Sequence, residues 1–285
     1  MLPPRADRGA LRLGGNALDW GQRTYVMGIV NVTPDSFSND GRVELERAVA
    51  RGVEQADAGS DVLDLGGEST RPGHERIDDA SEIRRVVPAI AALRERLPGV
   101  ALSIDTYKPQ VAREACAAGA DLINSVWGMD DALLDVAVEF GTPVVIMHNK
   151  ARAHYDGDAV DEVLRFLEEA AKRSVRRGIP ARHIVLDPGI GFGKTADQNI
   201  AVLHALARVV ALGFPTMIGA SRKSTIGKLT GRPVGERAFG TAATTALAVQ
   251  AGIDMVRVHD VAQTRDVLAV ADAIVRDWRP QGWIE

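Results

Sequence analysis

Short apolar runs alternate with long amphipathic stretches along most of this chain. The apolar runs predict strands at residues 24 to 30, 62 to 66, 101 to 105, 121 to 124, 143 to 147, 184 to 187, 215 to 219 and 255 to 258. The amphipathic stretches, rich in Ala, Leu, Glu and Arg, predict helices at 43 to 58, 81 to 97, 108 to 118, 130 to 140, 159 to 177, 197 to 212, 236 to 251 and 262 to 277. Eight strand-helix units in one chain indicate an α/β protein with a closed parallel (β/α)8 TIM barrel.

The alternation of strands and helices leaves a second arrangement open, with two doubly wound domains. No linker rich in Pro, Ser or charge divides the chain, so we favour one barrel over residues 24 to 285. Residues 1 to 23 are polar and glycine-rich and predict a separate β-hairpin, with Leu11 and Leu18 on either side of a glycine pair. We expect this hairpin to cover one end of the barrel.

Composition narrows the class of protein. The chain has 285 residues, 46% of them hydrophobic, which is enough to bury a large core. Its 34 basic and 38 acidic residues offer no electrostatic footprint for nucleic acid or an anionic membrane. Cys116 is the only cysteine, and its alanine neighbours predict a buried helix residue rather than a nucleophile. With no segment long and apolar enough for a membrane span or secretory signal, we expect a cytoplasmic protein.

One predicted strand ends in a glycine-rich segment. Residues 185 to 194 read Val-Leu-Asp-Pro-Gly-Ile-Gly-Phe-Gly-Lys, so the carboxylate of Asp187 is followed by three alternate glycines that let the backbone approach a ligand. The spacing fits neither a Walker loop, which needs glycine where Pro188 stands, nor the Gly-x-Gly-x-x-Gly dinucleotide fingerprint. Taken alone, the segment could also be an ordinary glycine turn.

Every predicted strand ends in polar residues, and in a barrel the active site lies at the carboxyl ends of the strands. Because alternate residues of a strand face the same way, Arg257 and His259 point together into the barrel mouth. With Arg71 and Asn31 they predict a cationic, donor-rich pocket for a phosphate or diphosphate. The alternative for Arg257 is an ion pair with a neighbouring carboxylate.

A second group of polar residues is expected across the mouth from these cations. Asp105, Asn124 and Asp187 offer carboxylate acceptors and an amide, which suit a flat nitrogen heterocycle with amino and amide edges. For Asp105 and Asp187 the alternative is a helix cap. The histidines lack the spacing of a zinc site, whereas Mg²⁺ bound by Asn31, diphosphate oxygens and water fits the preference of that ion for oxygen ligands.

Six motifs of this chain, in this order, resemble those of the dihydropteroate synthase family. They are NVTPDSF at residues 31 to 37, GESTRPG at 67 to 73, SIDT at 103 to 106, DPGIGFGK at 187 to 194, SRKS at 221 to 224 and RVHD at 257 to 260. The resemblance covers residues 24 to 277. It implies a transferase of folate biosynthesis that condenses 7,8-dihydropterin-6-ylmethyl diphosphate with 4-aminobenzoate, giving 7,8-dihydropteroate and diphosphate.

The resemblance also implies a role for each matching residue. Pterin would be bound by Asp105, Asn124, Asp187 and Lys223. Diphosphate would be bound by Asn31, Arg71, Arg257 and His259, with Mg²⁺ on Asn31. The aminobenzoate side would be formed by Thr70, Arg71, Pro72, Phe192, Lys223 and Ser224. Catalysis would involve Asp35, Lys223, Arg257 and His259, through electrostatic stabilisation of a dissociative transition state with no covalent enzyme intermediate.

Some positions depart from the family pattern. Ser125 follows Asn124 where an acidic residue is common, Asn149 and Lys150 follow His148 where Met is more usual, and Thr225 stands where Phe is frequent. Thr225 affects the expected shape of the aminobenzoate site and the response to sulfonamides, which the resemblance implies as competitive inhibitors. A pterin-binding methyltransferase and a non-catalytic binding module are the alternative functions. Outward apolar positions in the last two predicted helices indicate a homodimer.

Overall fold

A computed structural model describes residues 9 to 33, 41 to 69, 76 to 280 and 282 of the chain. Eight parallel strands form its central sheet: β3 (Tyr25–Asn31), β4 (Val62–Gly66), β5 (Ala101–Asp105), β6 (Leu122–Ser125), β7 (Val144–Met147), β8 (Ile184–Asp187), β9 (Met217–Ile218) and β10 (Met255–Val258). Neighbours pair in the order β8-β7-β6-β5-β4-β3-β10-β9, and a parallel bridge between Leu186 and Thr216 joins the two ends. The predicted (β/α)8 barrel is therefore confirmed.

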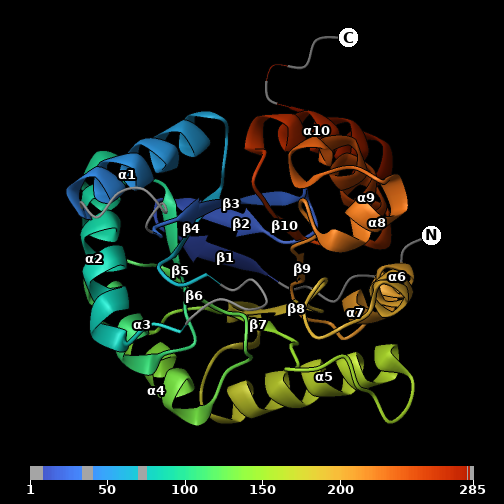
Figure 1. Ribbon diagram of the computed structural model, residues 1–285, viewed down its shortest axis with the longest axis horizontal. Helices are drawn as coiled ribbons and strands as arrows, with labels where there is room; N and C mark the ends of the chain where they lie inside the picture. Colours follow the sequence, from blue (N-terminus) through green and yellow to red (C-terminus); the bar gives the residue numbers. More distant parts are fainter. Residues whose placement is uncertain (1–8, 34–40, 70–75, 281, 283–285) are drawn as a thin grey trace.

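Helices surround the strands, as Figure 1 shows along the barrel. They are α1 (Gly41–Asp57), α2 (Asp79–Arg96), α3 (Pro109–Ala117), α4 (Asp131–Phe140), α5 (Ala159–Arg176), α6 (Ala196–His204), α7 (Leu206–Val210), α8 (Ser224–Thr230), α9 (Ala238–Ala251) and α10 (Val261–Arg276). Two short 3-10 helices, η1 (Ala181–His183) and η2 (Val234–Glu236), precede β8 and α9. Among the described helices, none is long and apolar enough to cross a membrane.

Three details differ from the predicted elements. The predicted helix over 197 to 212 is interrupted at Ala205, where the backbone (φ −95°, ψ 10°) leaves the helical range and separates α6 from α7. The predicted strand over 215 to 219 is reduced to Met217–Ile218. Helix α8 was not predicted; with seven residues it is too short for a clear hydrophobic period.

The predicted hairpin is also confirmed, as the antiparallel strands β1 (Ala10–Leu13) and β2 (Asn16–Asp19). Leu11, Leu13, Leu18 and Trp20 from this segment form a buried cluster with apolar residues contributed by all eight barrel strands. Because side chains alternate along a strand, the intervening positions, such as Val26 and Leu63, belong to a second core beneath the helices. The hairpin thus fills the barrel interior at the amino ends of the strands and leaves the carboxyl ends for the site.

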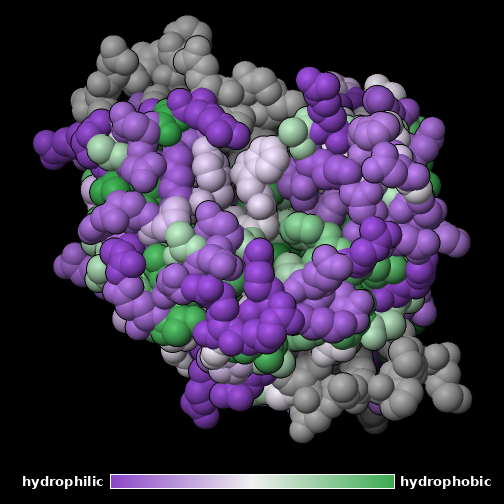
Figure 2. All heavy atoms as spheres, turned by 90° about the horizontal axis from the view of Figure 1, so that it is seen from below, coloured by the Kyte–Doolittle hydropathy of each residue, from purple (hydrophilic) through white to green (hydrophobic). Residues whose placement is uncertain are grey.

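The outer surface seen in Figure 2, viewed from the lower edge of Figure 1, is mostly hydrophilic with separate hydrophobic patches. Large apolar side chains are exposed on the last two helices, α9 and α10. Phe239 and Leu247 on α9 are 91% and 68% exposed, and Val270 and Ile274 on α10 are 62% and 77% exposed. These two helices pack against each other, so the four exposed side chains lie on adjacent helices.

Candidate active site

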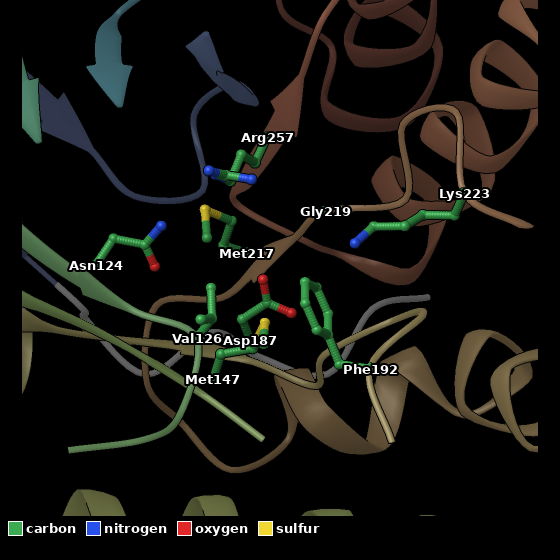
Figure 3. A pocket seen from close by; sticks show the side chains of 9 residues that line it. All are labelled: Asn124, Val126, Met147, Asp187, Phe192, Met217, Gly219, Lys223 and Arg257. Carbon is green, nitrogen blue, oxygen red and sulfur yellow. The ribbon is translucent and has the colours of Figure 1, made fainter. Parts of the chain in front are cut away.

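A pocket opens at the carboxyl ends of the barrel strands (Figure 3). Its lining side chains come from five strands and from the segments that follow β6, β8 and β9. They are Asn124, Val126, Met147, Asp187, Phe192, Met217, Gly219, Lys223 and Arg257. Met217 also belongs to the cluster that the hairpin closes, so the pocket is supported from below by the packed barrel interior.

Asp187 ends β8 and is 2% exposed. Its Oδ1 atom accepts a hydrogen bond of 2.7 Å from the backbone N–H of Gly189. Burial raises the pKa of Asp187 to about 6, while the Gly189 N–H and the nearby ammonium groups of Lys223 and Lys194 act in the opposite direction. At neutral pH the side chain is therefore an ionised acceptor beside the pocket.

The glycines after Asp187 are required by close packing. Gly189 has φ +70°, and a Cβ atom there would lie 1.9 Å from the carbonyl oxygen of His148. A Cβ atom at Gly191, φ +82°, would lie 2.8 Å from the Lys223 side chain. These positions therefore exclude other residues for reasons of both conformation and space. The segment that could have been a simple turn is shaped by its close approach to His148, which follows β7, and to Lys223.

Lys194 holds the backbone of this glycine-rich segment in place through hydrogen bonds. Its Nζ atom lies 2.9 Å from the carbonyl oxygen of Gly189, 3.1 Å from that of Phe192 and 3.0 Å from Nδ1 of His148. Burial lowers the pKa of His148 to about 3, with the nearby cations of Lys194 and Lys150 contributing. The imidazole is therefore neutral at pH 7 and accepts at Nδ1 from the ammonium group.

Lys223 lies next to this glycine-rich segment, where the chain leaves β9. Its Nζ atom is 3.8 Å from the centroid of the Phe192 ring, a cation–π contact. Burial and the nearby Arg257 lower the pKa of Lys223 to about 7, while Asp187 and Asp105 raise it. The preceding Arg222 has φ +58°, a left-handed conformation unusual for this residue, and ion-pairs with Asp260.

Arg257 on β10 is bound by two carboxylates. Its Nε atom donates to Oδ2 of Asp64 and its Nη2 atom to Oδ2 of Asp105, both at 2.6 Å. The expectation that Asp105 lies across the mouth from Arg257 is therefore wrong; the alternative of carboxylate pairing applies. Burial raises the pKa of Asp105 to about 7 against the opposing effect of Arg257. The buried Oδ1 atom of Asp105 has no hydrogen-bond partner within the described chain.

His259 follows the same strand and is held by Ser221, which lies after β9. The Ser221 hydroxyl oxygen accepts from the backbone N–H of His259 at 3.2 Å and lies 3.0 Å from its Nδ1 atom. Burial lowers the pKa of His259 to about 4, with further lowering by Arg222 and Arg257. The ring is thus neutral at pH 7, which corrects its assignment to a cationic pocket. If the hydroxyl donates to Nδ1, the ring proton is on Nε2.

The other predicted site residues divide into two groups. Asn31 is exposed at the end of β3, and Ser224 is exposed at the start of α8. Asp35, Thr70, Arg71 and Pro72 lie outside the described residues. In the described part of the chain, no group of three or more His, Cys, Asp or Glu side chains is arranged to hold a metal ion.

Sequence reasoning missed two residues that organise the site. Asp64 is fully buried within β4 and contacts both Asn124 and Arg257, and Lys194 binds the glycine-rich segment. A carboxylate inside an otherwise apolar strand, Val62–Gly66, was the available signal for Asp64. For Lys194 the sequence offered only its place after the last glycine.

Comparison with known proteins identifies the family of the chain. A family model described as pterin binding enzyme matches residues 27 to 259. The Bacillus subtilis dihydropteroate synthase is 44% identical over 263 residues, covering 91% of this chain and 92% of that protein. The Xanthomonas albilineans enzyme in complex with 7,8-dihydropteroate is 44% identical, with a TM-score of 0.85 over 93% of this chain and 98% of that one. The Yersinia pestis enzyme in a sulfonamide drug complex is 37% identical, with a TM-score of 0.85 over 93% and 98%.

The fold and the pocket therefore define a pterin-binding barrel enzyme. Within that class, the identity and coverage of the curated relatives show that the chain belongs to the dihydropteroate synthase family. It is accordingly a transferase, and the implied family resemblance of its six motifs is confirmed.

Proposed function

We propose that the pocket at the barrel mouth condenses 7,8-dihydropterin-6-ylmethyl diphosphate with 4-aminobenzoate in folate biosynthesis. The observation that carries the proposal is the position of Asp187, a buried carboxylate that faces the pocket beside Phe192, with Asn124 on one side and Lys223 on the other (Figure 3). Such a set of acceptors next to an aromatic wall suits a flat heterocycle that carries amino and ring N–H groups. The relative from Xanthomonas albilineans binds 7,8-dihydropteroate, the product of this reaction.

The pterin ring would bind in the deepest part of the pocket. Asp187 accepts from the amino-pyrimidine edge, and Asn124 and Asp105 are the remaining polar groups assigned to the ring. The unpartnered Oδ1 atom of Asp105 supports this assignment, because a buried oxygen without a hydrogen bond costs free energy until a ligand supplies the donor. Lys223 borders both the pterin and the aminobenzoate.

The diphosphate would leave toward Arg257 and His259. We assign to Arg257 the stabilisation of the developing negative charge, and to His259 a hydrogen bond from its neutral ring. Asn31 and Arg71 complete the same role, and Asp35 stabilises the positive charge that develops on the pterin methylene. A donor aimed at charge that appears only in the transition state contributes roughly 100-fold to 1000-fold in rate. The arylamine then needs only to be held in line with the methylene.

The aminobenzoate would bind nearer to the solvent. Phe192 and Lys223 form one wall and Ser224 lies beside it, with Thr70 and Pro72 assigned to the same site. A sulfonamide resembles aminobenzoate in shape and charge, and the Yersinia pestis relative binds such a drug. We therefore propose that sulfonamides compete with aminobenzoate at this enzyme.

Magnesium is the cofactor that this chemistry calls for. Asn31 offers an amide oxygen, exposed at the end of β3, which fits a hard cation that takes its remaining ligands from diphosphate oxygens and water. When bound, the ion neutralises charge on the leaving diphosphate. Asn31 would hold it at the mouth, on the side from which the diphosphate departs.

We further propose a homodimer in the cytoplasm. The exposed apolar side chains of Phe239, Leu247, Val270 and Ile274 support a self-association surface on α9 and α10. The single buried thiol, Cys116, suits a reducing compartment. Sedimentation of Phe239→Lys should yield monomers, whereas Val175→Lys, which replaces a 44% exposed side chain on α5, should leave dimers intact. Monomers in both the parent and the Val175→Lys variant would refute the assignment.

The assay that tests the reaction measures diphosphate release from the dihydropterin diphosphate with Mg²⁺, with and without 4-aminobenzoate. Release should require both substrates and fall at least about 100-fold in Asp187→Asn, because the buried acceptor pattern is lost. Asp266→Asn, an exposed position on α10, is the matched control. Pterin binding without pteroate formation under any condition would contradict the proposal and favour a methyltransferase or a binding module.

A further inference from the structure

Asp64 connects three strands of the barrel through its side chain. It lies in the middle of β4 with 0% exposure, and none of its hydrogen-bond donors belongs to that strand. Its Oδ1 atom accepts from the Ser103 hydroxyl at 2.6 Å. Its Oδ2 atom accepts from Asn124 Nδ2 at 2.9 Å and from Arg257 Nε at 2.6 Å. Two of the three donors therefore line the pocket.

The bond to Asp64 determines which way the Asn124 amide faces. A carboxylate is only an acceptor here, so Asn124 must place its NH₂ group against Oδ2. The reverse orientation would bring two oxygens together in a buried place and leave both without hydrogen. The carbonyl oxygen of Asn124 is consequently turned away from Asp64 and toward the pocket (Figure 3).

The Oδ2 atom of Asp64 also fixes the orientation of the guanidinium group of Arg257. With Nε on Asp64 and Nη2 on Asp105, the planar group is held at two of its three nitrogens. Within the described part of the chain, Nη1 donates no hydrogen bond to protein. The orientation that leaves this nitrogen available is set by the two carboxylates.

We propose that Asp64 is a positioning residue that sets the donor and acceptor pattern of the pocket. Through Asn124 it presents an acceptor to the heterocycle, so the pocket selects a ring with an N–H at that edge. Through Arg257 it aims a donor at the leaving group. The identity of the ring rests on the proposed function, but the orientation of Asn124 does not.

The choice of ligand separates the effect of Asp64 on binding of the ring from its effect on the leaving group. 6-Hydroxymethylpterin has no diphosphate, so its affinity, measured by calorimetry, reports binding of the ring without the contact of Arg257 to the leaving group. In Asp64→Leu the affinity should fall on the order of 10-fold to 100-fold, because the Asn124 amide is free to turn its NH₂ group to the ring donor. Asp64→Asn should stay within about 5-fold of the parent, since its own oxygen still accepts from both residues while its NH₂ donates to Ser103.

A double-mutant cycle distinguishes positioning from general support of the fold. If Asp64 acts through Asn124, then Asp64→Leu with Asn124→Leu should bind no more than about 3-fold worse than Asn124→Leu alone. Ser103→Ala, which removes a donor from Asp64 without touching a pocket residue, should leave ring affinity within about 3-fold of the parent. Losses that multiply in the double variant, or ring affinity in Asp64→Leu equal to that of the parent, would overturn the proposal.

A spectroscopic measurement covers the case in which Asp64→Leu does not fold. The NH₂ signals of Asn124, assigned in ¹⁵N-asparagine-labelled protein by their loss in Asn124→Leu, report the bond to the carboxylate directly. In Asp64→Asn the acceptor becomes a neutral amide, so the bonded proton should move upfield. An unchanged signal would mean that no such bond exists and would refute the role of Asp64. Failure of the proposed reaction would leave both readouts, ring affinity and proton shift, unaffected.

Discussion

The ammonium group of Lys223 lies 3.8 Å from the centre of the Phe192 ring, although the two residues follow different strands. Phe192 belongs to the glycine-rich segment after β8, and Lys223 comes directly before α8. A Cβ atom at Gly191 would lie 2.8 Å from the Lys223 side chain, so this contact depends on glycine as well as on the two partners. One wall of the pocket is thus built from an aromatic face and an amine whose pKa is about 7.

Phe192→Leu should weaken this wall without dismantling the pterin pocket. A cation–π contact contributes roughly 0.5 to 2 kcal/mol, so we expect the KM for aminobenzoate to rise about 3-fold to 30-fold. The affinity for 6-hydroxymethylpterin should change much less. Steady-state kinetics with Phe140→Leu, a 39% exposed position on α4, as the control would test this. An unchanged KM for aminobenzoate would remove Phe192 from that side of the site.

Ionisation of the buried Asp187 carboxyl should lower the free energy of unfolding of the enzyme. Its folded pKa of about 6 exceeds the ordinary aspartate value of 3.8, so the folded state binds more protons between these values and stability falls as pH rises through the window. Asn cannot ionise. Asp187→Asn should therefore be more stable than the parent by about 1 to 3 kcal/mol at pH 7.5, with the difference lost near pH 3.5. Urea unfolding at both pH values measures it; a gain of the same size at both would point to packing instead.

The barrel could be predicted from sequence because each of its strands is an apolar run bounded by polar residues. Four strands, including Val62–Gly66 and Ala101–Asp105, have the predicted limits. The hairpin was predictable from its leucines and glycine pair. The short helix α8 was not, because seven residues are too few for a clear hydrophobic period, and the break at Ala205 was not, because alanine itself favours helix.

The candidate site was predictable as a set of residues but not as a set of contacts. Strand ends identified Asp187, Asn124 and Arg257 because a parallel barrel brings these ends together. The pairing of Arg257 with Asp105 crosses from β10 to β5, and no spacing rule connects those strands. Likewise the neutral state of His259 results from burial near Arg222 and Arg257, which only a three-dimensional arrangement reveals.

Lys194→Met should loosen the segment that carries Phe192. The variant loses three hydrogen bonds, to Gly189, Phe192 and His148, two of which hold backbone carbonyl oxygens. We expect kcat/KM to fall on the order of 10-fold to 100-fold, because a small displacement of a substrate-binding segment is costly. Lys172→Met, which removes an exposed ammonium from α5, is the control. Activity equal to that of the control would show that the glycines alone shape the segment.

Lys108 should be indispensable to stability, because it is the cation between two buried carboxylates. Its Nζ atom lies 2.6 Å from Glu68 and 2.7 Å from Glu82, whose side chains are 5% and 1% exposed. Lys108→Met leaves both carboxylates without this partner, and breaking a buried pair in this way costs about 3 to 5 kcal/mol.

The effect of Lys108→Met should depend on pH in a defined direction. Burial already raises the pKa of Glu82, and loss of Lys108 raises it further, so the folded state takes up protons that the unfolded state releases. Stability of the variant should therefore fall as pH rises from about 4.5, and the deficit should be larger at pH 8 than at pH 5. Adding Glu82→Gln should recover part of the loss at pH 8. Urea unfolding of the three proteins gives the comparison, and a deficit independent of pH would show that Lys108 acts through its hydrogen bond to Ile77 instead.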